Sequence, residues 1–153
     1  MNALTVATLH RFDALHASMK EVITALPAQA LDWSPAPEVN SVAVLVAHVC
    51  GSERFWIGEK IGELDAQRDR DAEFTVRGLD HARLTAMLDA SLGMMQPVLE
   101  KLTLDEMSRP ASAPVSRDGS AHDVAWCLQH ALEHVAVHTG HVELMRQWWK
   151  SQP

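Results

Sequence analysis

The sequence has too few basic residues for a nucleic-acid surface. Thirteen lysines and arginines stand against 20 aspartates and glutamates, which gives a formal net charge of −7, and no basic stripe overrides this balance. We therefore expect neither nucleic acid nor an anionic membrane as a partner. Arg68 and Arg70 stand among aspartates and are interpreted as part of a solvated loop. No apolar run is long enough to span a bilayer, and no signal-peptide pattern opens the sequence.

Cysteine is scarce as well, with two residues in 153. Cys50 and Cys127 each stand inside an apolar helical pattern, where cysteine usually behaves as a small hydrophobic residue. Two such residues do not make a disulfide framework, so we expect a protein of the reducing cytoplasm. Burial should raise the pKa of both thiols and leave them unreactive.

Strand-like alternation and internal repeats are absent, and four stretches carry helical periodicity instead. In the first stretch, for example, Phe12, Leu15 and Met19 recur at intervals of three and four. The expected helices span residues 4–26, 41–61, 80–102 and 120–149. Four long helices with substantial loops predict an all-α protein, a four-helix bundle. The length suits one domain over residues 1–153.

Local signals set the expected helix ends. Ser41 and Asp80 are suitable N-caps for the second and third helices, and Ser120 with Asp123 resembles a capping box for the last one. Pro97 should weaken or kink the third helix, because proline removes a backbone donor. Phe55 and Trp56 are expected among the buried residues of the second helix.

Histidine is abundant, with nine residues in the chain. Four of them fall in the last expected helix: His130, His134, His138 and His141. At about 100° per residue they project from one narrow face, which we expect to point into the bundle. The same face carries Trp126, Cys127, Met145 and Trp148.

Such a row of histidines predicts a metal site. Burying neutral imidazoles without partners costs free energy, and charging several together is worse because like charges repel. A divalent cation solves both problems, since it binds the ring lone pairs and favours the neutral form. Two histidines four residues apart form the usual chelating pair on a helix. Partly exposed or hydrogen-bonded core histidines are the alternative interpretation.

A third ligand should come from a neighbouring helix, because two ligands rarely hold zinc tightly. His48 is the candidate, since the apolar run from Val42 to Val49 gives a histidine no packing reason to be there. A local motif competes: His130, Glu133 and His134 match H-x-x-E-H, the inverted zinc-peptidase pattern with the glutamate as base. We weigh it low because only 19 residues follow His134, which leaves little room for another ligand and a substrate cleft.

The sequence resembles the DinB/YfiT-like superfamily over nearly the whole chain. The resemblance rests on Leu31-Asp32-Trp33-Ser34-Pro35 followed by Asn40-Ser41, on His48, and on the run His134-Val135-Ala136-Val137-His138-Thr139-Gly140. It implies a four-helix bundle, a divalent metal held by His48, His134 and His138, and a homodimer. Some members transfer mycothiol, bacillithiol or glutathione. The family often has glutamine after the glycine, where this chain has His141.

We therefore expect a metal-dependent enzyme that transfers a low-molecular-weight thiol to an electrophile, with zinc or nickel as the metal. Three neutral ligands leave the metal its positive charge and an open position, which lowers the pKa of a bound thiol or water. His130 and His141 are candidates for orienting ligands or moving protons. Glu53 and Glu133 are candidate bases or ordinary surface carboxylates.

Other function classes stay open. The same site with bound water would make a metal-dependent hydrolase, and a closed site would make a non-catalytic metal-binding stress-response protein. A third alternative is an interaction module that uses Trp148 and Trp149, which otherwise pack at the end of the bundle or in a dimer contact.

Overall fold

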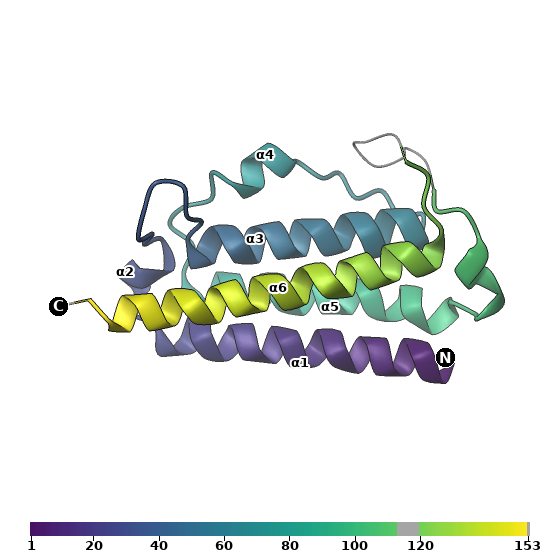
Figure 1. Cartoon of the computed structure of the whole chain (residues 1–153), viewed down its shortest axis with the longest axis horizontal. Coiled ribbons are helices and arrows are strands. Elements are labelled where there is room, and N and C mark those ends of the chain that lie inside the picture. The colour runs from purple at the N-terminus through teal and green to yellow at the C-terminus, as the bar shows by residue number, and fades with distance from the viewer. Residues whose placement is uncertain (113–119, 153) are drawn as a thin grey trace.

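The computed structural model describes residues 1–112 and 120–152, and it shows four long helices side by side (Figure 1). These are α1 (Ala3–Ala25), α3 (Val42–Glu53), α5 (His81–Lys101) and α6 (Val124–Lys150). η1 (Arg54–Ile61) continues α3, and the connections contain α2 (Ala28–Leu31), α4 (Arg70–Glu73) and η2 (Asp105–Ser108). The described residues form no strand, so the predicted all-α bundle is confirmed. None of the described helices is both long and apolar enough to cross a membrane.

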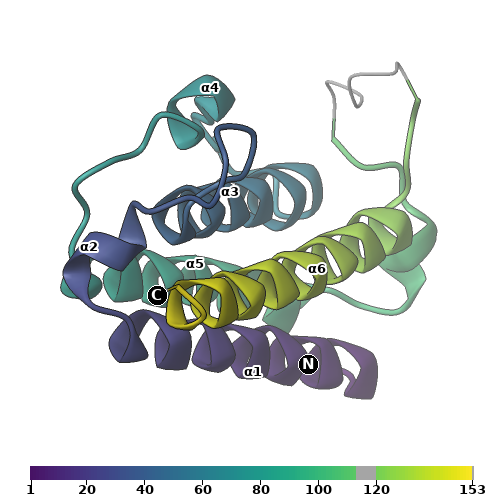
Figure 2. The same cartoon turned by 60° about the vertical axis from the view of Figure 1, so that its left-hand side comes forward.

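The order of the helices requires one long connection. α1 packs against α5 and α6, and α3 packs against the same two helices, so α1 and α3 lie diagonally opposite. α1 and α6 run in one direction while α3 and α5 run in the other (Figure 1). Residues 62–80 therefore return along the length of the bundle before α5 begins. This crossover carries α4 over the outer side of α3 (Figure 2).

α3 is buried on all sides. Its residues from Val42 to Cys50 are all buried, and apart from His48 and Cys50 they are valine, alanine and leucine. A helix that is apolar all round is typical of a position without a solvent face. Here α5 and α6 contact it within the bundle, and α4 contacts it as well. His48 consequently lies in the protein interior, with 8% of its surface exposed.

The capping predictions are confirmed at two helices and wrong at the third. The side chain of Ser41 accepts a hydrogen bond from the amide of Val44, and Asp80 accepts one from the amide of Arg83. α6 begins after Asp123, whose carboxylate accepts from the amide of Trp126. Ser120 therefore precedes the helix and is not its cap.

η1 changes the inward face of the second long helix. Its backbone hydrogen bonds follow the wider π pattern, as in the 2.9 Å bond from Gly62 N to Ile57 O. The wider turn moves the buried positions along the chain, so Ile57 and Ile61 are buried. Phe55 and Trp56 are only partly buried, contrary to the expectation from α-helical spacing. α5, in contrast, continues past Pro97 to Lys101.

A polar cluster lies in the centre of the bundle. Glu53 Oε1 is 2.8 Å from His16 Nε2 on α1, and Ser91 Oγ on α5 donates to Glu53 Oε2 at 2.5 Å. His16, Glu53 and Ser91 are 0%, 1% and 7% exposed. The interpretation of Glu53 as a surface carboxylate is therefore wrong, because its side chain is buried between three helices.

We predict that Glu53→Ala lowers the free energy of unfolding by about 1–3 kcal/mol, because it leaves a buried histidine and a buried serine without their hydrogen-bond partner. Urea titration followed by circular dichroism measures this change. The matched control is Glu133→Ala on the exposed side of α6, which should stay within about 0.5 kcal/mol of the parent protein. An equally small loss for Glu53→Ala would contradict the stabilising role of this cluster.

Candidate metal centre

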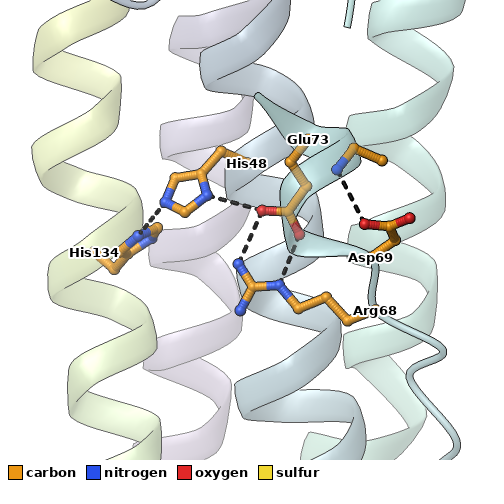
Figure 3. Close-up of polar contacts among 6 residues, drawn as sticks. His48, Arg68, Asp69, Glu73 and His134 are labelled. Carbon is orange, nitrogen blue, oxygen red and sulfur yellow. Dashed lines mark hydrogen bonds and ion pairs between the residues drawn. The ribbon is translucent and has the colours of Figure 1, made fainter. Parts of the chain in front are cut away.

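Three histidines from two neighbouring helices converge. His48 on α3 and His134 and His138 on α6 each offer one ring nitrogen, and these atoms all lie within 4.8 Å of one another. The Nε2 atoms of His48 and His134 are 3.0 Å apart (Figure 3). The structure thus brings together the ligand set that the family resemblance implies. Among the described residues no fourth histidine, cysteine or carboxylate joins this group.

The electrostatic environment keeps the two α6 rings neutral. Burial lowers the pKa of His134 to about 3, and the neighbouring rings of His138 and His48 add to this effect. Burial also lowers the pKa of His138 to about 4, with His48 and His141 contributing. Both rings therefore carry a free lone pair near pH 7, which is the form that binds metal.

These residues suit a divalent metal ion. Imidazole nitrogens are common ligands of zinc and nickel, and three of them meet here without a carboxylate between them. His134 Nδ1 is buried and has no hydrogen-bond partner. A buried polar atom without a partner is costly. The donor set therefore fits a bound cation.

Glu73 binds the far side of His48. Its Oε2 is 2.9 Å from His48 Nδ1, and Arg68 donates to both carboxylate oxygens, at 2.7 Å from Nε and 3.0 Å from Nη2 (Figure 3). Burial by itself raises the pKa of Glu73, but hydrogen bonds from His48 and Arg68 outweigh it and hold the pKa below its usual value. Glu73 is therefore an ionised, buried carboxylate beside the histidine cluster.

Neither Glu73 nor Arg68 is among the site residues that the sequence predicts. The interpretation of Arg68 as part of a solvated loop is wrong, because Arg68 forms an ion pair with buried Glu73. Arg70 lies over the Phe74 ring at 4.9 Å, and Phe74 in turn packs against His48 with ring centroids 4.9 Å apart. The only available signal was indirect: a buried histidine on α3 needs an acceptor for its second ring nitrogen.

His130 and Glu133 lie outside the cluster. The ring of His130 stacks on Trp126, with centroids 4.8 Å apart and planes 10° apart, and its edge meets Trp56. Burial lowers the pKa of His130, and nearby Glu133 only partly opposes this. Glu133 itself is exposed. The H-x-x-E-H residues are thus not gathered around one point with a third ligand.

The histidine row lies beside the buried face of α6 rather than at its centre. His141 is exposed, with its Nδ1 3.3 Å from Nδ1 of His138. Trp126 and Trp148 are each 39% exposed, so the prediction that they point into the bundle is wrong. Cys127 and Met145 are buried as predicted. The row therefore faces α3 at one edge and solvent at the other.

The fold and the site define a class: an all-helical bundle with a candidate metal centre between two of its helices. The chain belongs to the DinB superfamily, whose family model matches residues 11–142. This match includes the three convergent histidines. A comparison with curated protein sequences found no relative.

Solved structures share the fold at low sequence identity. A conserved protein of Enterococcus faecalis has a TM-score of 0.75 and 18% identity, covering 96% of each chain. A DinB-like protein of Bacillus subtilis has a TM-score of 0.71 and 19% identity, covering 95% of this chain and 93% of that one. A mycothiol-dependent maleylpyruvate isomerase has a TM-score of 0.62 and 12% identity, covering 88% of this chain and 59% of that one.

We predict that His138→Ala loses bound metal, whereas His130→Ala keeps it. The reason is that His138 lies in the three-histidine group and His130 lies in the aromatic stack. Metal content is measured by elemental analysis on protein purified without a histidine tag, with folding checked by circular dichroism. If His130→Ala lost the metal while His138→Ala kept it, the H-x-x-E-H interpretation would be correct instead.

We predict that both cysteines resist alkylation in the folded protein at pH 8. Burial raises the pKa of Cys127 to about 11 and that of Cys50 well above its usual value, so both thiols stay protonated at this pH. Mass spectrometry after brief iodoacetamide treatment should show labelling only once urea is added. Rapid labelling of native protein at either position would show that the thiol is reactive.

Proposed function

We propose that the protein is a metal-dependent enzyme that holds one divalent ion with His48, His134 and His138 and transfers a low-molecular-weight thiol to an electrophile. The observation that carries the proposal is the convergence of three imidazole nitrogens with no fourth protein ligand among the described residues. A structural zinc site usually has four protein ligands, whereas a catalytic one keeps a position open. Zinc or nickel is the proposed ion.

The proposed chemistry follows from the charge of the site. A divalent ion held by neutral ligands lowers the pKa of a thiol or water bound beside it and so supplies a nucleophile near pH 7. His141 contacts His138, and we assign it the role of orienting that ring. His130 is half-buried one turn before His134 and is the candidate for moving a proton.

Two other functions use the same site. If water replaces the thiol, the protein is a metal-dependent hydrolase. If no substrate reaches the ion, it is a non-catalytic metal-binding protein. Thiol transfer is preferred because one structure of similar fold is a mycothiol-dependent isomerase, although that likeness concerns the fold. A cleft of about 510 Å³ near Ile61, Gly62 and Val98 has no histidine in its lining, so it is separate from the three-histidine group.

We propose one domain over residues 1–153, a homodimer, a cytoplasmic location, and a small thiol and a small electrophile as partners. Trp148 is partly exposed near the end of α6, and it offers apolar surface for a second copy. Light scattering at working concentration tests the dimer directly.

We predict that zinc- or nickel-loaded protein accelerates the reaction of mycothiol, bacillithiol or glutathione with an electrophile, and that His48→Ala abolishes this acceleration. Loss of free thiol is followed with and without metal, with metal content measured on every sample. A loaded protein that hydrolyses esters without consuming thiol would indicate the hydrolase. A loaded protein inactive in both assays would indicate the non-catalytic alternative.

A further inference from the structure

The geometry points to Glu73, held by Arg68, as a positioning residue that fixes the ring proton of His48 and, through His48, that of His134. This inference deepens the proposed function, because it states which nitrogen of His48 is presented to a metal. It starts from the contacts in Figure 3, where Glu73 and His134 lie on opposite sides of the His48 ring.

Glu73 determines which nitrogen of His48 carries the ring proton. A carboxylate accepts hydrogen bonds but has no proton to donate. Because Glu73 Oε2 is 2.9 Å from His48 Nδ1, the proton of a neutral His48 ring resides on Nδ1. Its Nε2 then carries the lone pair, and this atom faces α6. Glu73 thereby selects the tautomer of His48 whose Nε2 lone pair can bind a metal ion on the side of His134 and His138.

His48 in turn determines which nitrogen of His134 carries the ring proton. Its Nε2 is 3.0 Å from Nε2 of His48, and only one atom of such a pair can donate. Since His48 Nε2 carries a lone pair, His134 Nε2 donates, and the lone pair of His134 is on Nδ1. That atom is buried without a hydrogen-bond partner. His48 therefore offers its Nε2 to a cation without rearrangement, while His134 can offer Nε2 only after its proton leaves that atom.

Neighbouring residues hold the Glu73 carboxylate in place. Arg68 binds both of its oxygens, and α4, which ends with Glu73, is capped by Asp69 through the amide of Ala72. Gly51 leaves the space that the carboxylate occupies, since a Cβ there would lie 2.0 Å from Glu73 Oε1. The atoms in the way belong to the end of a flexible side chain, so any substituent at Gly51 displaces the carboxylate rather than the backbone.

Two variants separate this role from a merely structural one. Glu73→Gln keeps the size of the side chain, but an amide can donate as well as accept, so it no longer fixes the tautomer of His48. Gly51→Ala keeps Glu73 and moves its carboxylate. Glu133→Gln is the matched control, because Glu133 is an exposed glutamate directly before His134 that no hydrogen bond joins to a ligand histidine.

The first test uses metal-free protein, so that it does not depend on the proposed function. Nitrogen-15 NMR of the histidine rings at pH 7 reports which nitrogen of each ring is protonated. We expect His48 to be protonated on Nδ1 and His134 on Nε2 in the parent protein and in Glu133→Gln. We expect both His48 tautomers in Glu73→Gln and Gly51→Ala. A parent His48 protonated on Nε2, or variants identical to the parent, would overturn the inference.

The second test is zinc affinity, measured by competition with a chelating dye. Loss of a carboxylate that orients a ligand histidine should weaken binding about 10–100-fold in both variants, with Glu133→Gln unchanged. Variants that lose only stability, with zinc affinity and tautomer intact, would make Glu73 structural and refute the inference. If the parent protein binds neither zinc nor nickel, the proposed function fails, and the tautomers of the metal-free protein still decide the role of Glu73.

Discussion

A histidine in the middle of a helix that is buried on every side needs a partner for each ring nitrogen. His48 is in this position, because the residues around it on α3 are almost all buried valine, alanine and leucine. Water cannot satisfy the ring, and an unpaired polar atom in such a place costs free energy. One nitrogen reaches Glu73 and the other reaches His134. The arrangement of α3, α4 and α6 around this ring meets that requirement.

The chain direction of the helices makes the arrangement possible. α3 and α5 run the same way, so the connection between them has to return along the bundle (Figure 1). A short hairpin loop would have left the outer side of α3 open to solvent. The long crossover instead covers it and brings Arg68, Glu73 and Phe74 to His48. A segment without helical periodicity thus supplies the carboxylate that is hydrogen-bonded to His48.

Local patterns in the sequence predict the helices, and spacing predicts part of the site. Three- and four-residue periodicity predicts all four long helices, and α3 differs from the others because it is buried on all sides rather than along one stripe. The i, i+4 spacing of His134 and His138 depends on one helix alone, so it too can be read locally. Glu73 and Arg68 could not be found this way, since their contact with His48 depends on the path of the crossover. The exposure of Trp126 also escaped prediction, because periodicity does not say which edge of a stripe meets solvent.

The described residues include two polar clusters that contain a buried histidine, and access distinguishes them. In the central one, Glu53 is bonded by His16 and Ser91, and all three side chains are enclosed by helices. Its carboxylate is hydrogen-bonded inside the core, away from solvent. In the other, the carboxylate of Glu73 is already bound by Arg68, and the rings of His134 and His138 are half-buried next to exposed His141. Neutral imidazole rings that border solvent can bind a cation, so the edge of α6 suits the proposed metal ion and the enclosed centre of the bundle does not.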